Sequence, residues 1–308
     1  MGATKVECAE RGWNLVTGCS PVSAGCLNCY AARQAATRLK HLPRYAGLAS
    51  YSSGRGRWSG DVRVHRDLLA EPLFKRSRST WFVAPRGDFF HDAVPADFLD
   101  EAFAVMNRAR EQVFIIPTKR LDRALAYLND PGRKTAILMA AATRVLVDGV
   151  PYCEALDMPW PLPNVILLAS IEDQATADYR VPRLLQCNAA WCGVSAEPLL
   201  GDLVLEPWLQ YPPLHDSGRY KMTFSVDEFR GLDWVIAGVE SLPGLRAGRG
   251  AMLYATRVSA LIDQCRDSDA AFFHKQSVIG GHVSRKPDEW PPELRVREYP
   301  ELFGRECA

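Results

Sequence analysis

Three cysteines near the N-terminus have the spacing of a metal centre. Cys19, Cys26 and Cys29 lie within eleven residues in a Cys-x6-Cys-x2-Cys pattern. The residues between them include several turn formers, so the stretch predicts a loop that folds back on itself. Thiolates on one compact loop can converge on one centre, whereas three unrelated reduced thiols are the alternative. An Ala-rich segment of helical propensity follows Cys29 directly.

Three thiolates leave two metal interpretations open. A closed tetrahedral zinc site needs a fourth ligand, for which Cys8, His41 or a more distant residue are the candidates. A four-iron cluster instead takes three irons on protein thiolates and keeps its fourth iron open for a ligand. The cysteine count does not choose between these interpretations, so the rest of the chain has to decide.

Composition places the chain among folded, globular proteins. The 308 residues are 47% hydrophobic, enough for one large α/β domain or two ordinary ones. A net charge of +1 gives no overall electrostatic footprint for nucleic acid, although it leaves room for a local basic patch. Nine cysteines without a secretory segment or an apolar run of 18 residues predict a cytoplasmic, reducing compartment, no membrane span, and thiols that are free or metal-bound.

Short apolar runs alternate with helical patterns along most of the chain. We expect strands at 15–16, 81–84, 113–116, 165–169, 191–195, 234–238 and 271–273, and helices at 95–110, 121–128, 174–185 and 254–265. Continuous apolar runs are typical of parallel strands buried on both faces. The alternation predicts an α/β fold, namely a partial (β/α) TIM-type barrel of about six to seven parallel strands, with a doubly wound sheet as the alternative.

Insertions and a C-terminal tail interrupt this alternation of strands and helices. We expect a barrel domain over residues 1–280, with insertions at about 41–80, 129–164 and 201–230, and an irregular C-terminal tail over 281–308. The first insertion predicts a hairpin or short strand near 62–64. Its mixture of arginines and aromatic residues suits contact with phosphates and bases, and a solvated loop is the alternative of equal weight.

Polar and ionisable residues follow every predicted strand. In a barrel the carboxyl ends of the strands form one face, which carries the active site. A single charged residue after a strand is often only a helix cap or a solvated turn, but the whole set predicts a functional face. Besides the cysteine loop, its members are Gly87-Asp88, Thr118-Lys119-Arg120, Ser170-Ile171-Glu172, Ser195-Ala196-Glu197, Gly238-Val239-Glu240-Ser241 and His274-Lys275-Gln276.

A three-cysteine loop after the first strand of a partial barrel resembles the arrangement of radical S-adenosylmethionine (SAM) enzymes. The chain is also similar, over residues 11–278, to a phage-encoded family that occurs in scattered bacteria. That family was long filed as a domain of unknown function and is related to radical SAM proteins. The x6 gap matches this family and departs from the usual Cys-x3-Cys-x2-Cys. Gly238-Val239-Glu240-Ser241-Leu242, His274-Lys275-Gln276-Ser277 and residues 84–88 depart from the family pattern, which bears on substrate choice.

The resemblance implies an activity and its cofactors. Cys19, Cys26 and Cys29 would be the catalytic ligands of a [4Fe-4S] cluster whose open iron binds SAM. Reduction by an external electron donor would then release a 5′-deoxyadenosyl radical. The implied substrate is a nucleotide or a modified DNA base, with isomerisation of a base substituent as one reaction, in the host cytoplasm if the chain is phage-encoded. The alternatives are a zinc-stabilised nucleic-acid-binding module without catalysis and a degenerate barrel that keeps a structural cluster.

The same resemblance implies residues that bind SAM. Asn28 and Tyr30 flank the last cysteine and would contact the adenine or the cluster edge. Gly87 and Asp88 would receive the SAM amino group. The remaining expectations are Ser170 and Glu172 for the ribose and carboxylate, Ser195 and Glu197 for the same groups or the substrate, Gly238 and Glu240 for the adenine, and Lys119, Arg120, His274 and Lys275 for the SAM carboxylate or a substrate phosphate.

Overall fold

Two units organise the chain in the computed structural model, which describes residues 4, 6–143, 146–147, 150–151, 158–210, 230–240 and 251–303. Unit 1 comprises residues 1–170 and 186–191, and unit 2 comprises residues 171–185 and 192–308. The span expected to be one domain over 1–280 is therefore divided between two units, and the expected C-terminal tail belongs to unit 2.

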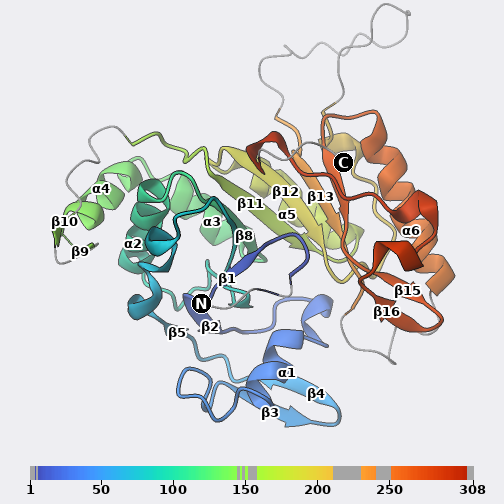
Figure 1. Ribbon diagram of the computed structural model, residues 1–308, viewed down its shortest axis with the longest axis horizontal. Coiled ribbons are helices and arrows are strands. Elements are labelled where there is room, and N and C mark those ends of the chain that lie inside the picture. Colours follow the sequence, from blue (N-terminus) through green and yellow to red (C-terminus); the bar gives the residue numbers. More distant parts are fainter. Residues whose placement is uncertain are drawn as a thin grey trace, which may run out of the picture. The chain divides into compact units, whose positions relative to one another are not determined.

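Four parallel strands form the centre of unit 1. They are β1 (Arg11–Trp13), β6 (Thr80–Val83), β8 (Val113–Thr118) and β11 (Val165–Ile171), hydrogen-bonded in that order. Helix α2 (Ala96–Arg108) links β6 to β8, α3 (Leu121–Leu128) follows β8, and α4 (Arg133–Thr143) packs on α2 (Figure 1). The apolar runs of β6, β8 and β11 are almost wholly buried, as strands covered on both faces require.

Three further parallel strands belong to unit 2. They are β12 (Trp191–Ala196), β13 (Trp234–Ala237) and β14 (Ala271–His274), accompanied by α5 (Gln174–Gln186) and α6 (Ala251–Arg266). The described strands of the main sheet follow chain order, β1-β6-β8-β11-β12-β13-β14, as successive units of a β/α barrel do. The expected α/β fold with about seven parallel strands is confirmed.

The first strand is the exception to the predicted pattern. The apolar pair at 15–16 falls at β2 (Val16–Gly18), which belongs to a separate small sheet with β5 (Arg63–Val64) and β7 (Arg86–Gly87). The strand that begins the main sheet is β1, whose sequence Arg-Gly-Trp contains no apolar run. Its pairing with β6 and the burial of Trp13 against Phe114 hold it in place. The cysteine loop consequently follows β2.

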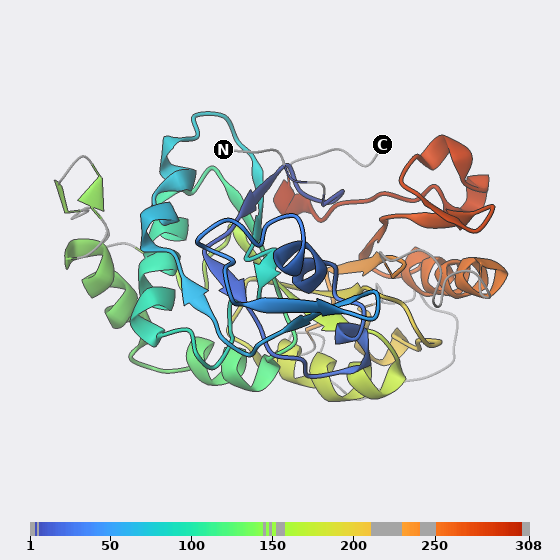
Figure 2. The same cartoon turned by 90° about the horizontal axis from the view of Figure 1, so that it is seen from below.

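The insertion at 41–80 packs on the helix that follows the cysteine loop. Strands β3 (Ala49–Ser52) and β4 (Arg55–Trp58) form an antiparallel hairpin beside α1 (Tyr30–Ala36), as both views show (Figures 1 and 2). Gly56 permits this contact, because a Cβ atom there would lie 2.2 Å from the backbone nitrogen of Arg33. The strand expected near 62–64 is β5.

The other insertions and the tail are more ordered than expected where the structure describes them. The segment 129–164 contains α4 and the short pair β9 (Leu146–Val147) and β10 (Val150–Pro151), and Glu206–Trp208 forms a 3₁₀ turn. The tail expected to be irregular contains β16 (His282–Ser284), which pairs with β15 (Ser277–Ile279), and three 3₁₀ turns. Trp290, Leu294 and Phe303 of this tail are buried in unit 2.

Candidate functional site

The cysteine loop joins β2 to α1 within unit 1. Cys19 directly follows β2, Cys26 closes a 3₁₀ turn (Ala24–Cys26), and Cys29 occupies the N-cap position of α1. Gly18 lets the chain enter the loop, because its φ of +93° is left-handed and a Cβ atom there would meet the Asp61 carbonyl oxygen at 2.1 Å. The predicted loop and the helix after it are confirmed, and all three cysteines are partly accessible.

The three thiols are close enough to act on one another electrostatically. Burial is the main cause of the raised pKa of Cys19, and the neighbouring Cys29 contributes to it. Burial likewise dominates the raised pKa of Cys29, and Cys26 contributes. A group raises the pKa of an acid in this way only when its own negative charge would lie nearby. Cys29 is therefore within electrostatic range of both other thiols of the loop, and convergence of all three on one centre stays a prediction.

Arg120 is the cation beside Cys19. Its Nη1 donates to Cys19 Sγ at 3.6 Å and to Asp88 Oδ2 at 3.0 Å. Burial, followed by the charge of Asp88, raises the pKa of Cys19 to about 12, and Arg120 acts against both. Because a metal binds the thiolate, a guanidinium at this sulfur favours the form that ligation requires.

Lys119 supplies a second cation, near Cys26. Lys119 Nζ donates to Ser23 Oγ at 3.0 Å, and Ser23 Oγ lies 3.9 Å from Cys26 Sγ. Burial acts to raise the pKa of Cys26, but the Lys119 charge and hydrogen bonds with the backbone of Val22 and Ser23 outweigh it, so the pKa of this thiol is lowered. Cys26 therefore loses its proton most readily of the three.

Cys29 receives N–H groups rather than a side-chain cation. Burial raises the pKa of this thiol, and hydrogen bonds from the backbone of Ala32 and Ala31 and from the side chain of Trp58 oppose the rise. Since the indole N–H is the only donor of a tryptophan side chain, β4 presents that N–H to the sulfur. The N-terminus of α1 and the indole dipole both favour negative charge at Cys29.

Asp88 is fully engaged by groups of unit 1. Its Oδ1 accepts hydrogen bonds from Thr118 Oγ1 at 2.7 Å and from the Phe90 backbone N–H at 3.0 Å. Its Oδ2 accepts from the Lys119 backbone N–H at 3.1 Å and from Arg120 Nη1 at 3.0 Å. Four donors satisfy a carboxylate, so Asp88 has little capacity left for the expected SAM amino group. The geometry makes Asp88 a positioning residue that orients the segment after β8 and the guanidinium of Arg120.

A second network fixes the residue after Cys19. Arg120 Nη2 donates to Ser20 Oγ at 2.8 Å and to the Ser20 carbonyl oxygen at 3.0 Å. The Ala93 backbone N–H donates to Nδ1 of His91, so in the neutral ring Nε2 carries the proton and donates to Ser20 Oγ at 2.9 Å. Burial, followed by the charge of Arg120, lowers the pKa of His91, which favours that neutral ring.

Asn28 is the clearest sign of a missing partner in the loop. Its side chain is 4% exposed, and both its Nδ2 and its Oδ1 are buried without a hydrogen-bond partner. Leaving such a group unsatisfied costs about 1–3 kcal/mol, so a ligand that offers both a donor and an acceptor would compensate for it. The expected contact of Asn28 with a bound group stays a prediction, which this unsatisfied amide supports.

Two other expected residues of this loop region have roles in the backbone framework. Tyr30 donates from its hydroxyl to the Pro85 carbonyl oxygen at 2.7 Å. Gly87 lies in β7, where a Cβ atom would approach the Val16 carbonyl oxygen to 2.8 Å, so the pairing of β7 with β2 favours glycine. Both residues help to hold the cysteine loop against the strand ends of unit 1.

Unit 2 contains a separate polar cluster at the ends of its strands. Lys275 Nζ bridges both carboxylate oxygens of Glu197, at 2.7 Å and 2.8 Å, and Ser195 Oγ donates to the same carboxylate at 3.1 Å. Gly238 makes room for that carboxylate, because a Cβ atom at this position would lie 2.5 Å from Glu197 Oε1. The expected residues Ser195, Glu197, Gly238 and Lys275 thus form one cluster.

Other residues expected to contact SAM have structural partners. Glu172 is fully buried and forms an ion pair with Arg180 at 3.0 Å, so its carboxylate is not presented to a ligand in this arrangement. His274 is also fully buried, its Nδ1 bonds to the Leu294 carbonyl oxygen at 2.8 Å, and burial lowers its pKa to about 4. A neutral, enclosed imidazole does not suit the expected contact with a carboxylate or phosphate.

The last of the expected residues lie near the ends of their strands. Ser170 is half-buried near the end of β11, and Glu240 is buried just after β13. Ser241 and Leu242 lie outside the described residues, as do Cys153 and Cys307.

Sequence reasoning missed the contribution of Trp58, Ser20 and His91. Ser20 directly follows a predicted ligand, which is a signal in itself. His91 comes three residues after Asp88, close to a predicted strand end. Nothing in the sequence links Trp58 to Cys29, because their contact arises only when the β3–β4 hairpin folds onto α1.

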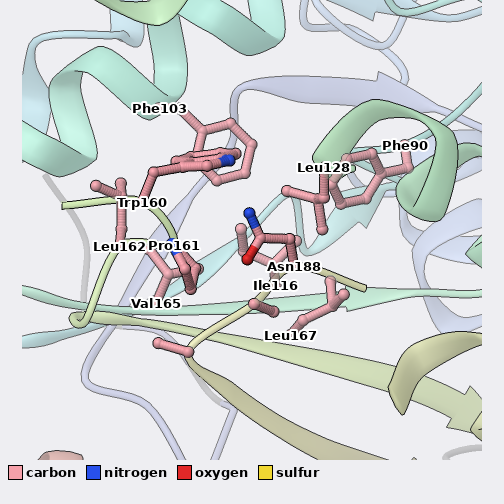
Figure 3. Close-up of a pocket in the computed structure, with 12 residues that line it drawn as sticks. Phe90, Phe103, Ile116, Leu128, Trp160, Pro161, Leu162, Val165, Leu167 and Asn188 are labelled. Carbon is pink, nitrogen blue, oxygen red and sulfur yellow. The ribbon is translucent and has the colours of Figure 1, made fainter. Parts of the chain in front are cut away.

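Unit 1 also contains a small hollow, which is lined almost entirely by apolar residues. Figure 3 shows Phe103 and Trp160 side by side there, with ring centroids 5.5 Å apart in an edge-to-face arrangement. The other lining residues are Phe90, Ile116, Leu128, Pro161, Leu162, Val165, Leu167, Asn188, Ala189 and Ala190. With Asn188 as the single polar member of the lining, we regard this hollow as part of the hydrophobic core.

Two features are absent from the part of the chain that the structure describes. No set of three or more His, Cys, Asp or Glu side chains is arranged there to hold a metal ion. None of the described helices combines the length and apolar character needed to cross a membrane.

Comparison with known proteins identifies the family of the chain. Neither the comparison with curated proteins nor that with solved structures found a match. The family model described as "Protein of unknown function (DUF5131)" matches residues 3–305, which includes the cysteine loop and both polar clusters. The chain therefore belongs to the DUF5131 family.

Proposed function

We propose that this protein is a radical SAM enzyme in which Cys19, Cys26 and Cys29 hold a [4Fe-4S] cluster. The observation that carries the proposal is the gathering of three cysteines on one loop, each beside a different group of positive polarity. Arg120 lies at Cys19, Lys119 near Cys26, and the Trp58 N–H at Cys29. Thiolates that share one cluster concentrate negative charge, which such neighbours stabilise.

Three cysteines without a fourth ligand suit a four-iron cluster better than a site for a single zinc ion. In a four-iron cluster each thiolate binds its own iron, so the sulfurs stand further apart than the ligands of one zinc ion at about 2.3 Å each. The mutual effects of these thiols on their pKa values support such a looser arrangement. The unsatisfied amide of Asn28 beside Cys29 offers a donor and an acceptor to a ligand of the open iron.

When bound and reduced, the cluster would supply an electron to SAM and so give a 5′-deoxyadenosyl radical. The residues of this chain would bind and orient the cofactors around that chemistry. Arg120, held by Asp88, and Lys119 would stabilise the charge on the thiolates. Asn28 would hydrogen-bond SAM at the cluster edge.

The substrate class rests on the sequence resemblance. We propose a nucleotide or DNA base, with isomerisation of a base substituent as one reaction and the cytoplasm as its place. The Ser195, Glu197 and Lys275 cluster of unit 2 supports recognition of a polar group, because its hydroxyl, carboxylate and ammonium offer both donors and acceptors.

Anaerobic reconstitution followed by incubation with dithionite and SAM tests the proposal. We expect a brown protein with about four irons per chain and production of 5′-deoxyadenosine detected by mass spectrometry. A fully loaded cluster that yields no 5′-deoxyadenosine would leave catalysis without support. A colourless protein that binds one zinc ion would instead favour the zinc-stabilised binding module.

A further inference from the structure

Positive charge in this chain is concentrated in one part of unit 1. The segment 30–66, which we call the basic lobe, comprises α1, the β3–β4 hairpin and the chain up to Arg66. The whole chain has a net charge of only +1, and the one acidic residue of this segment is Asp61. Against it stand eight basic residues: Arg33, Arg38, Lys40, Arg44, Arg55, Arg57, Arg63 and Arg66. The rest of the chain is therefore net acidic.

Several of these cations point to solvent without a carboxylate partner in the described contacts. Arg44, Arg63 and Arg66 are held by carboxylates or backbone carbonyls of unit 1. Another group is exposed, namely Arg33, Arg38, Lys40 and Arg57. The close backbone contact of Gly56 with Arg33 brings Arg33 and the hairpin arginines onto one part of the surface.

An apolar centre adjoins these charges at the cysteine loop. Leu27 is 45% exposed and Tyr30 is 38% exposed, and they flank Cys29 in the sequence. Tyr30 and Arg33 are three residues apart on α1, so they share one helix face. A small apolar centre with a charged rim suits a transient protein contact of modest area.

The basic lobe also reaches the proposed cluster directly. Strands β3 and β4 pack on α1, and α1 begins at the residue after Cys29. A protein seated on this surface would therefore lie next to one cluster ligand. A nucleic acid would also be attracted by the charge, so binding of an oligonucleotide is the rival outcome of the test below.

We propose that the basic lobe is the docking surface for an acidic one-electron carrier protein. This inference rests on the proposed function, because it needs a cluster to receive the electron. In the transfer, the reduced carrier loses one electron, the [4Fe-4S]²⁺ cluster gains it to become [4Fe-4S]⁺, and no bond is made or broken. The acidic surface of the carrier meets Arg33, Arg38, Lys40 and Arg57, and its cofactor faces Leu27 and Tyr30.

Charge reversal on the full-length, cluster-loaded protein tests the docking surface. The variant combines Arg33→Glu with Arg57→Glu, and the control combines Arg76→Glu with Lys134→Glu, which are exposed residues of unit 1 outside the basic lobe. Both doubles change the net charge equally. Anaerobic stopped-flow spectroscopy follows cluster reduction by a reduced acidic flavodoxin as the probe, at low and at high salt.

We expect the rate constant for reduction by flavodoxin to fall about ten-fold or more in the basic-lobe variant at low salt, and its salt dependence to be largely lost. The control variant should keep the wild-type rate within about two-fold, since its substitutions lie off the docking surface. Reduction by photoexcited deazariboflavin, a neutral small molecule, should be equal in all three proteins, which shows that the cluster is intact.

The same proteins separate this inference from its rivals. If the basic-lobe variant is reduced by flavodoxin as fast as the control, the docking proposal is overturned while the cluster and the proposed function stand. If it also loses binding to a fluorescent single-stranded oligonucleotide, the basic lobe is a nucleic-acid surface. A wild-type protein that takes up no iron overturns the proposed function and this inference together.

Discussion

Cys19, Cys26 and Cys29 differ in how readily each thiol loses its proton. Burial, followed by Asp88, raises the pKa of Cys19 to about 12, burial also raises that of Cys29, and Lys119 with the neighbouring backbone lowers that of Cys26 against the effect of burial. Because the thiolate is the nucleophile, iodoacetamide should alkylate Cys26 of the metal-free protein first at neutral pH. Peptide mass spectrometry over time gives the order.

A Lys119 variant tests whether the charge of this residue makes Cys26 the most reactive thiol. Lys119→Met should slow alkylation of Cys26, whereas Lys134→Met, which removes an exposed charge elsewhere in unit 1, should not. Preferential labelling of Cys19 would contradict the charge arrangement described for the loop.

Each of the three cysteines should be indispensable for metal binding. Replacing any one of them with Ala leaves two thiolates, so the reconstituted protein should lose most of its iron. Cys265→Ala is the matched control, because this buried thiol of α6 lies in unit 2, and the other cysteines, Cys8, Cys153, Cys187, Cys192 and Cys307, should also be replaceable. Colorimetric iron analysis measures the outcome. If Cys8→Ala bleaches the protein as fully as Cys26→Ala, the site has four cysteines and no open iron.

Replacement of Asn28 should raise the stability of the protein and weaken its binding of SAM. Its buried amide has no partner in the described residues, so Asn28→Leu should raise the free energy of unfolding of the metal-free protein by about 1–3 kcal/mol in urea. The same change should weaken SAM binding to the loaded protein by about ten-fold, since a hydrogen bond to the ligand is lost.

Asn107 of α2 provides the control for Asn28. It is equally buried, and both its amide atoms also lack a partner. Asn107→Leu should raise stability in the same way and leave SAM affinity unchanged. An Asn28→Leu variant that binds SAM normally would reduce Asn28 to a packing residue.

At the scale of elements, the hairpin β3–β4 is positioned by one residue without a side chain. A Cβ atom at Gly56 would meet Arg33 N, Arg33 Cα and Ala32 C at 2.2, 2.4 and 2.5 Å, all of them backbone atoms of α1. Gly56→Ala should therefore push the hairpin off α1 and lower the free energy of unfolding by about 1–3 kcal/mol. Ser50→Ala on exposed β3 should be close to neutral. Urea unfolding followed by tryptophan fluorescence compares them, and equal midpoints would refute the close packing.

The elements that could be predicted are those whose own residues specify them. Strands β6, β8 and β11 are apolar runs, and α3 has the periodic apolar face of a helix, so each was expected within a few residues of its place. Strand β1 could not be predicted, because its pairing with β6 rather than its sequence makes it a strand. The hydrogen bond from Trp58 to Cys29 and the engagement of Asp88 by four donors are tertiary in the same sense.

At the scale of the whole molecule, the sequence could predict some residues of the candidate site and not others. The spacing of the cysteines indicates a metal centre because its geometry is local to one loop. Asp88 and Glu197, which the strand-end rule singled out, each lie in a polar cluster of their own unit. The rule could not tell a ligand from a structural ion, and Glu172 with Arg180 is such a structural pair.

The C-terminal tail shows that an irregular segment can belong to the core. Trp290 is 1% exposed, its ring centroid lies 4.5 Å from that of His274, and the Arg297 guanidinium lies 4.9 Å from its ring. Trp290→Ala should therefore lower the free energy of unfolding by about 3–5 kcal/mol, the usual cost of removing a large buried aromatic ring. Glu293→Ala, at an exposed position of the same tail, should change it by less than about 0.5 kcal/mol. Urea unfolding monitored by circular dichroism measures both, and equal midpoints would mean that unit 2 is stable without this tail.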